Sequence, residues 1–274
     1  MLKTPFALIT GASEGLGRHL AFQCAARGYH LVLVALPNSG LPQLAQFIKE
    51  HYGVYAIAIE ADLSQEIACQ ALHRELKERG ICINVLINNA GLGGTYFFDQ
   101  NEADYYSYVI KLNVTTPTVL CRLFLDDLRR SKPSYILNVS SLASFFSLPR
   151  KQVYAGTKAY VLTFSRCLRK ELKGDGISVS ALCPGGINTS WQLTLQHRTT
   201  TNWLARQSFM NPDIVAAIAV QQMLAGKEVI IPGAYNRAFK FFNPFLPAFI
   251  KNRLMDRQMK KLHHIRHLAV KPAA

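Results

Sequence analysis

The sequence has no closely paired cysteines, no long apolar run and few acidic residues. Its six cysteines are scattered without a C-x-x-C pair or a histidine at zinc-finger spacing, which excludes a disulfide framework and a zinc knuckle and indicates a reducing compartment. No uninterrupted apolar stretch approaches the roughly 20 residues that a membrane-spanning helix needs. The first residues lead directly into an apolar strand, so we expect no signal peptide in front of it. Together these absences predict a cytoplasmic protein.

The shortage of acidic residues is concentrated at one end of the chain. Lys and Arg number 31 against 17 Asp and Glu, which gives a net charge of +14 over 274 residues. Residues 237–274 hold nine Lys or Arg and one Asp, so +8 of this charge belongs to one short segment. The excess over the remaining chain is too dilute for a nucleic-acid footprint, and we expect no nucleic-acid partner. With 49% hydrophobic residues the chain can fill a large core, which excludes disorder over most of its length.

The order of apolar and amphipathic segments predicts an α/β fold. Short runs rich in Val, Ile and Leu, without polar alternation, are typical of parallel strands that are covered on both faces. We expect these strands at residues 6–10, 30–36, 54–59, 84–88, 135–139, 178–183 and 229–231. Helical periodicity predicts helices at residues 15–27, 42–52, 65–79, 102–130, 153–173 and 212–225. The pattern predicts one doubly wound domain over residues 1–236, with a seven-stranded parallel sheet, helices on both faces and a functional lid at 184–211.

A glycine-rich loop follows the first predicted strand. Gly11, Gly15 and Gly17 fall between this strand and a helical segment. Glycines at such a place let the backbone turn tightly and bring backbone N–H groups close to a pyrophosphate. They also place that anion at a helix N-terminus, where the helix dipole favours it. The loop therefore indicates a dinucleotide-binding site.

The G-x-x-x-G-x-G spacing of this loop is the first of several motifs that follow one another in a characteristic order. The others are Asp62-Leu63, Asn88-Asn89-Ala90-Gly91, Asn113, Ser140-Ser141, Tyr154-Ala155-Gly156-Thr157-Lys158 and Pro184-Gly185-Gly186. From about residue 5 to residue 235 the chain thus resembles the short-chain dehydrogenase/reductase family. The resemblance implies a Rossmann-type fold and an NAD(P)-dependent oxidoreductase that transfers a hydride between nicotinamide and a secondary alcohol or ketone. It also implies a homo-oligomer.

Tyr154 and Lys158 stand four residues apart in a predicted helix, so both side chains project from one face. A nearby ammonium favours the phenolate, and we expect it to lower the tyrosine pKa from its usual value near 10 toward the working pH. The resemblance implies that Tyr154 is the catalytic acid or base and that Lys158, also catalytic, holds the nicotinamide ribose. It implies that the catalytic Ser141, thirteen residues before Tyr154, binds the substrate oxygen in preference to Ser140. It implies that Asn113 keeps a helix open around a water of the proton relay.

The resemblance also implies a set of cofactor contacts. These are Thr10, Gly11, Ser13, Glu14, Gly15, Leu16, Gly17, Ala35, Asp62, Leu63, Asn89, Ala90, Gly91, Tyr154, Lys158, Pro184, Gly185, Ile187 and Thr189. Ala35 stands where NAD-preferring members of the family carry an acidic residue that binds the ribose hydroxyls. Leu36 stands where many NADP-preferring members carry an arginine that binds the 2′-phosphate. Because nothing there repels a 2′-phosphate, NADP(H) is favoured over NAD(H).

The substrate side is predicted from apolar residues near the motifs. Expected lining residues are 93–97, Phe145, Phe146, Leu148, Trp191, Leu193, Leu195 and Trp203. Aromatic side chains of this kind suit a large apolar substrate, such as a steroid, a 3-oxoacyl chain or a long-chain lipid ketone, and they suit a protein core equally well. Arg150 and Lys151 are candidates for binding a substrate carboxylate.

Residues 237–274 form a basic amphipathic extension for which the sequence leaves two arrangements open. Phe245, Phe249 and Leu254 belong to an apolar stripe of helical period that is flanked by lysines and arginines. Such a helix can make a peripheral contact with an anionic membrane, or its stripe can pack over the substrate mouth or a second subunit. His263, His264 and His267 have helical spacing but no carboxylate partner, so we assign no metal site.

The glycine loop and the basic extension also fit an alternative function. A non-catalytic dinucleotide-binding scaffold or sensor at a membrane surface would need both features. It would not need Asn113, Ser141, Tyr154 and Lys158 together, and their joint presence favours the oxidoreductase.

Overall fold

The computed structural model of the protein describes residues 5–188 and 208–245. It confirms the predicted doubly wound α/β fold, because seven parallel strands form one sheet in the order β3-β2-β1-β4-β5-β6-β7. The strands are β1 (Phe6–Thr10), β2 (His30–Ala35), β3 (Ala56–Glu60), β4 (Ile83–Asn88), β5 (Ser134–Val139), β6 (Ile177–Leu182) and β7 (Val229–Ile230). All of their boundaries fall within two residues of the ranges predicted from the sequence.

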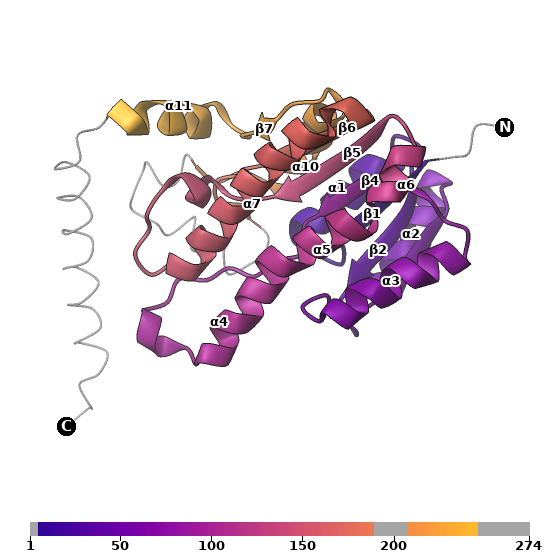
Figure 1. Ribbon diagram of the computed structural model, residues 1–274, viewed down its shortest axis with the longest axis horizontal. Coiled ribbons are helices and arrows are strands. Elements are labelled where there is room, and N and C mark those ends of the chain that lie inside the picture. The colour runs from indigo at the N-terminus through magenta and orange to yellow at the C-terminus, as the bar shows by residue number, and fades with distance from the viewer. Residues whose placement is uncertain (1–4, 189–207, 246–274) are drawn as a thin grey trace.

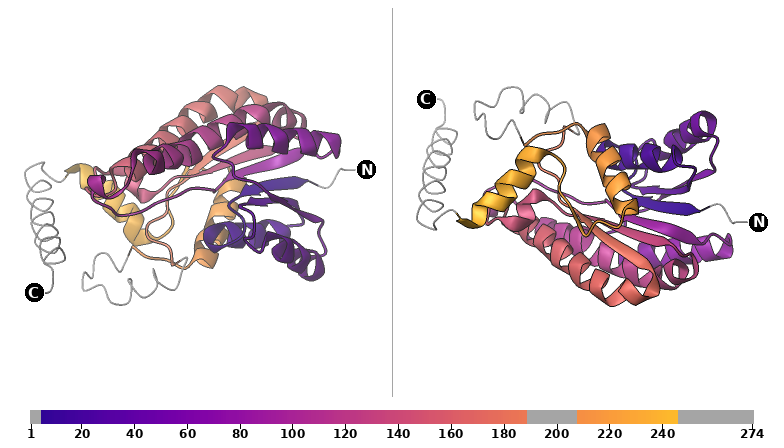
Figure 2. Two further views of the ribbon diagram at one scale, coloured as in Figure 1. Left: turned by 90° about the horizontal axis from the view of Figure 1, so that it is seen from below. Right: turned by 90° about the horizontal axis from the view of Figure 1, so that it is seen from above.

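Helices cover both faces of the sheet (Figures 1 and 2). One face is packed by α1, α2 and α10, and the other by α3, α5, α6 and α7. The α-helices of the described residues are α1 (Gly15–Ala25), α2 (Leu41–Tyr52), α3 (Glu66–Glu78), α4 (Ala103–Ile110), α5 (Thr116–Leu123), α6 (Leu125–Arg130), α7 (Gln152–Glu171), α10 (Pro212–Leu224) and α11 (Ala234–Phe242).

The strands have apolar residues on both faces because both faces are buried. Successive residues of a strand point to opposite sides of a sheet. Ala7 and Ile9 of β1 therefore belong to the core under α1, α2 and α10, whereas Leu8 belongs to the core under α3, α5, α6 and α7. This division explains the absence of polar alternation in the sequence.

The prediction of one continuous helix over residues 102–130 is wrong. Helices α4 and α5 are joined by a π-helical segment, Lys111–Thr115, and α6 follows α5 as a separate helix. Pro117 has no backbone N–H to donate to the carbonyl of Asn113, and the N–H of Thr116 bonds the carbonyl of Lys111. Pro117 therefore encodes the wider turn, although the helical periodicity of this segment does not reveal it. The wider turn positions the Asn113 side chain.

The parallel arrangement collects the motifs at one edge of the sheet. Asn88 of β4 pairs with Asn138 of β5, and Val139 pairs with Leu182 of β6, so these strands end close together. In doubly wound sheets ligands bind at this carboxyl edge. Most segments that carry the site motifs leave strands here, whereas Asn113, Tyr154 and Lys158 belong to helical segments.

Helix α11 is the first part of the basic extension, and Figure 1 shows it at the β7 side of the sheet. It begins at Ala234 and spans the expected domain boundary after residue 236, which stays a prediction. Residues 246–274, which include Phe249, Leu254 and the three histidines, lie outside the described residues. Among the residues that are described, no helix is long and apolar enough to cross a membrane.

Candidate active site

The glycine loop between β1 and α1 packs directly against the loop that follows β4. A Cβ atom on Gly17 would collide with the carbonyl oxygen of Gly11 and would lie 2.6 Å from Asn89 Nδ2. Gly11 has φ of 62°, and a Cβ atom there would lie 2.9 Å from the Ala90 Cα. Both positions therefore require glycine. The first turn of α1 has neither an acidic residue nor a side-chain cap, so its N–H groups can receive a pyrophosphate, and the loop fits this part of a dinucleotide.

Thr10 and Asn89 fix this loop through hydrogen bonds to the backbone. The Thr10 hydroxyl accepts bonds from the N–H groups of Asn89 and Ala90, both at 3.0 Å. The Asn89 amide donates to the carbonyls of Thr10 at 2.9 Å and Gly11 at 3.0 Å. Thr10, expected to contact the cofactor, is only 1% exposed and lies outside the cavity lining. Its hydroxyl is used to hold the loop together.

A cavity of about 550 Å³ runs along the glycine loop and the ends of β2 and β4. Its volume is in the range of small-molecule sites. Twelve predicted cofactor residues line it: Gly11, Ser13, Glu14, Gly15, Leu16, Gly17, Ala35, Asp62, Leu63, Asn89, Ala90 and Gly91. Ser39, Tyr108 and Leu112 also line it, although no motif marked them. Among the described lining residues the charged ones are Glu14 and Asp62.

The two serines after β5 have different hydrogen-bond partners. Ser140 Oγ donates to the Lys158 carbonyl at 2.7 Å in the protein interior, so its hydroxyl holds α7 against β5. Both serines line a second cavity together with Tyr154, but Ser141 Oγ accepts a bond from the Ala143 N–H at 3.1 Å and is hydrogen-bonded to Tyr154. This geometry supports the choice of Ser141 over Ser140 for contact with a substrate.

Tyr154 and Lys158 project from α7 into the same cavity. The Lys158 ammonium lies 5.9 Å from the centre of the Tyr154 ring and donates to the Val139 carbonyl at 2.8 Å. Burial lowers the pKa of Lys158 to about 8. Burial raises the pKa of Tyr154, and its hydrogen bond with Ser141 only partly opposes this effect. The expected lowering of the tyrosine pKa is therefore not found, because burial acts against the charged form of both groups.

Asn113 joins three parts of the site from within the π-helical segment. Its side chain accepts a bond from the Leu92 N–H and donates to the Leu92 carbonyl, both at 2.9 Å, and it also donates to Thr157 Oγ1 at 3.0 Å. It is 1% exposed. Asn113 thus holds the loop after β4 against α7 beside Tyr154 and Lys158, which is a positioning role.

The second cavity, of about 840 Å³, continues from the first, because Asn89, Gly91 and Leu92 line both. Residues predicted for the catalytic, nicotinamide or substrate side that line it are Gly93, Gly94, Thr95, Tyr96, Ser141, Phe146, Leu148, Tyr154, Lys158, Pro184, Gly185 and Ile187. We call this cavity the substrate cleft.

Two predicted lining residues of the described part do not line the substrate cleft, whereas two aromatic residues that were not predicted do. Phe97 lies under the Arg150 guanidinium at 4.8 Å, and Phe145 packs against the buried cluster that contains Leu162. Phe209 and Phe239 line the cleft instead. Phe239 comes from α11, beyond the last motif, and no sequence signal identified it.

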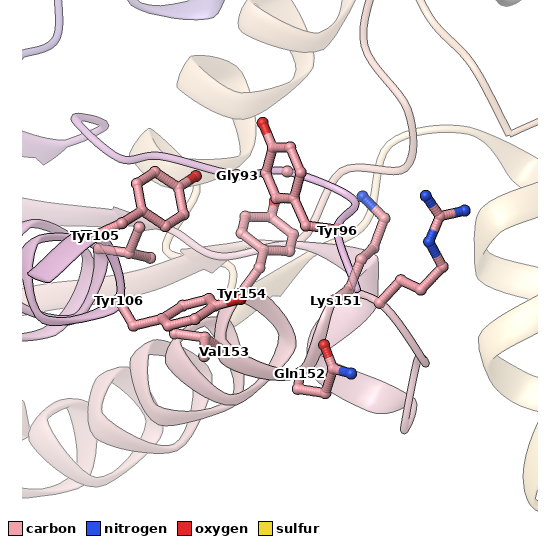
Figure 3. A pocket seen from close by; sticks show the side chains of 11 residues that line it. Gly93, Tyr96, Tyr105, Tyr106, Lys151, Gln152, Val153 and Tyr154 are labelled. Carbon is pink, nitrogen blue, oxygen red and sulfur yellow. The ribbon is translucent and has the colours of Figure 1, made fainter. Parts of the chain in front are cut away.

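A smaller pocket opens beside Tyr154 at the start of α7 (Figure 3). Tyr96, Tyr105 and Tyr106 line it together with Lys151. Figure 3 shows Lys151 and Tyr154 side by side, with both side chains extending toward Tyr96.

Several predicted site residues fall outside the described part of the chain. They are Thr189, Trp191, Leu193, Leu195 and Trp203. Of the predicted lid at 184–211, the described ends are joined by a parallel bridge between Ile187 and Met210.

Comparison with known proteins identifies related chains. Residues 5–199 match the family described as short chain dehydrogenase. Very-long-chain 3-oxoacyl-CoA reductase of Mus musculus is 32% identical over 183 residues, which cover 65% of this chain and 58% of that protein. 17-beta-hydroxysteroid dehydrogenase type 3 of Mus musculus is 28% identical over 197 residues, which cover 71% of this chain and 64% of that protein. The chain thus spans less than two thirds of these curated relatives.

Two solved structures are similar over nearly the whole chain. The bulky-bulky ketone specific alcohol dehydrogenase from Comamonas testosteroni is 30% identical with a TM-score of 0.73, and the match covers 98% of this chain and 97% of that one. A short-chain dehydrogenase from Sphingobium yanoikuyae in complex with NADPH is 28% identical with a TM-score of 0.74 and the same coverage. The similarity therefore extends beyond the glycine loop to the substrate side.

Proposed function

The chain belongs to the short-chain dehydrogenase family, and we propose that it is an NAD(P)-dependent oxidoreductase that reduces the ketone of a hydrophobic substrate to a secondary alcohol. The observation that carries the proposal is the continuity of the two cavities. A dinucleotide held along the glycine loop can extend past Asn89 and Gly91 into the cleft that contains Ser141, Tyr154 and Lys158. Reduction therefore has its cofactor site and its acid in one connected space.

Ser141, Tyr154 and Lys158 have distinct parts in this reaction. The first turn of α1 holds the pyrophosphate and Lys158 holds the nicotinamide ribose. A nicotinamide bound beside them would supply the hydride that the carbonyl carbon accepts. Ser141 donates a hydrogen bond to the carbonyl oxygen, and Tyr154 delivers the proton to it. Because burial raises the pKa of Tyr154, the phenol keeps the proton that the reduction consumes.

Lys158 supports the proton transfer electrostatically. With a pKa lowered to about 8, it is still mostly protonated at neutral pH. A positive charge buried next to the developing oxyanion stabilises it more strongly than the same charge would in water. Through its bonds to Leu92 and Thr157, Asn113 holds helix α7 and the loop after β4 in position around these groups.

The decisive experiment is the substitution Tyr154→Phe. It removes the proton donor and keeps the ring, so we expect kcat for ketone reduction to fall by about 10² to 10⁴-fold, whereas the Kd for NADPH changes by less than about twofold. Absorbance of the reduced cofactor gives the rate, with ketones of graded size as substrates. Tyr160→Phe is the matched control, because Tyr160 lies on the same helix but is exposed and bonds Thr118.

The same measurements distinguish the non-catalytic alternative. If native protein binds NADPH but oxidises it with none of the ketones, a dinucleotide-binding scaffold or sensor replaces the proposed enzyme. If Tyr154→Phe retains the native rate, the assignment of the acid is refuted.

Within this function we propose a preference for NADP(H) over NAD(H). Ala35, the last residue of β2, and Leu36 after it both line the cofactor cavity, so no carboxylate at these two positions repels a 2′-phosphate. The Sphingobium yanoikuyae relative is in complex with NADPH. Arg18 binds the Ser13 carbonyl at 2.6 and 2.9 Å, which keeps one cation at this end of the loop.

We propose a large hydrophobic ketone as the substrate class. The relatives are named for very-long-chain 3-oxoacyl-CoA, a hydroxysteroid and bulky ketones. In this chain Phe146, Phe209 and Phe239 give the substrate cleft aromatic walls that suit such molecules. A homo-oligomer, a peripheral membrane contact of the extension and a cytoplasmic location stay predictions.

A further inference from the structure

The described lining of the substrate cleft contains two charged residues, Lys151 and Lys158, and no acidic one. Lys158 is bound to the Val139 carbonyl and belongs to the proposed catalytic group. Lys151 stands immediately before α7 and has no part in the reaction as derived above. Its ammonium is the one charge of the described lining that the proposed reaction does not use.

Lys151 has no carboxylate partner among the described residues. Its ammonium lies 5.4 Å from the centre of the Tyr154 ring, a cation–π distance. Its neighbour Arg150 brings a second positive charge, although that guanidinium faces the Phe97 ring and the Thr95 carbonyl. Burial, and then the charge of Arg150, lower the pKa of Lys151. A partly buried ammonium in these surroundings is incompletely compensated, and an anion would stabilise it.

The position of Lys151 relative to Tyr154 limits the kind of anion. The two side chains extend from the start of α7 in the same direction (Figure 3), and both line the substrate cleft. A ligand that bonds Lys151 with a carboxylate can therefore reach Tyr154 and Ser141 with a carbonyl only a few carbons away. The remainder of such a ligand would lie along Phe146, Phe209 and Phe239.

We propose that Lys151 binds the carboxylate of the substrate, so that the preferred substrates are ketones with an apolar chain and a carboxylate a few carbons from the carbonyl. This inference rests on the proposed reductase function and adds a charge requirement to it. Lys151 is then the residue that selects an oxo acid over a neutral ketone of the same length.

Paired substrates test the charge requirement. For the native enzyme we expect kcat/KM for 3-oxododecanoate to exceed that for its methyl ester by about tenfold or more. In Lys151→Met, which keeps the length of the side chain and removes its charge, this ratio should fall to about one. In 11-oxododecanoate the carboxylate lies at the opposite end of the chain from the ketone. For this compound the native enzyme should reduce the acid and its methyl ester with equal kcat/KM. A ratio measured on one preparation does not depend on how much of the variant is correctly folded.

Lys49→Met is the matched control. Lys49 also lies over a tyrosine, with its ammonium 5.7 Å from the centre of the Tyr55 ring, but it belongs to α2 and lines neither cavity. Its substitution should leave the substrate ratio at the native value. Lys151→Arg should retain most of the preference, because it keeps the charge.

The outcomes for Lys151 and for the proposed function can be separated. If native enzyme reduces acid and ester equally, or if Lys151→Met keeps the native ratio, the inference is overturned while the reductase function stands. If neither substrate is reduced, the proposed function fails, and calorimetry then tests the site directly. In that case dodecanoate should bind native protein at least about tenfold more tightly than Lys151→Met, and equal affinities would refute the inference.

Discussion

Around the glycine loop the contacts are made mostly by backbone atoms, whereas around the substrate cleft the walls consist largely of side chains. The Asn89 side-chain amide donates to the carbonyls of Thr10 and Gly11 at 2.9 and 3.0 Å, and a Cβ atom on Gly17 would collide with the Gly11 carbonyl oxygen. In the substrate cleft, Phe239 lies 5.1 Å from Phe146 between ring centres and remains 45% exposed. The first arrangement admits few residue types, and the second admits many of similar size. The comparison predicts unequal responses to substitution in the two regions.

Among substitutions that compare the two regions, the largest effect on cofactor binding is expected from Gly17→Ala. The added methyl group would meet the Gly11 carbonyl oxygen and the Asn89 amide, and neither can move without opening the loop. Overpacking of this kind costs about 1–3 kcal/mol, and the displaced N–H groups no longer face the pyrophosphate. We expect the Kd for NADPH to rise by about 100-fold, measured by titration of cofactor fluorescence.

Gly156→Ala is the control for this change. Gly156 is an exposed residue of α7, and a Cβ atom there would meet nothing within 4 Å. Alanine should stabilise the helix by about 0.5–1 kcal/mol, observed as a higher Tm, with the native Kd for NADPH. Equal losses of binding in both glycine variants would break the contrast between a restrictive loop and a tolerant surface.

A second prediction concerns the rim of the cofactor cavity, where close backbone packing no longer limits the type of residue. Leu36 is exposed there, so Leu36→Asp can be accommodated without collision, and it places a carboxylate beside the ribose. Repulsion of the 2′-phosphate and new bonds to the ribose hydroxyls should shift the ratio of NADPH to NADH affinity toward NADH by about tenfold. Titration of native protein and variant with both reduced cofactors measures this ratio. An unchanged ratio would show that the 2′-phosphate of NADPH does not lie beside residue 36.

The difference between the two regions also explains what could be predicted from the sequence. Gly11 and Gly17 were identified because close backbone packing leaves no alternative residue. The spacing of Tyr154 and Lys158 placed both on one helical face, and the structure places both in one cleft. Such features depend on local geometry, which a linear pattern records.

The features that were missed depend on burial and on distant packing. The raised pKa of Tyr154 follows from its enclosure by separate segments, which helical spacing does not report. The interruption at Lys111–Thr115 had a local signal in Pro117, but the helical periodicity on both sides of this residue concealed it. Phe239 reaches the cleft only because α11 lies against the segment that carries Phe146. No motif records contacts of this type.

The smallest effect is expected from Phe239→Ala in the substrate cleft. Half of the ring is already exposed, so its removal should cost a bound hydrophobic ketone about 1 kcal/mol, or about fivefold in kcat/KM. A short ketone that does not reach α11 should lose less, and the Kd for NADPH should not change. Phe241→Ala is the matched control, since Phe241 lies on the same helix, is 61% exposed and does not line the cleft. Phe239→Ala could instead weaken NADPH binding as strongly as Gly17→Ala does. The two regions would then act as one packed unit, and the contrast between a cofactor side that admits few residue types and a substrate side that admits many would be wrong.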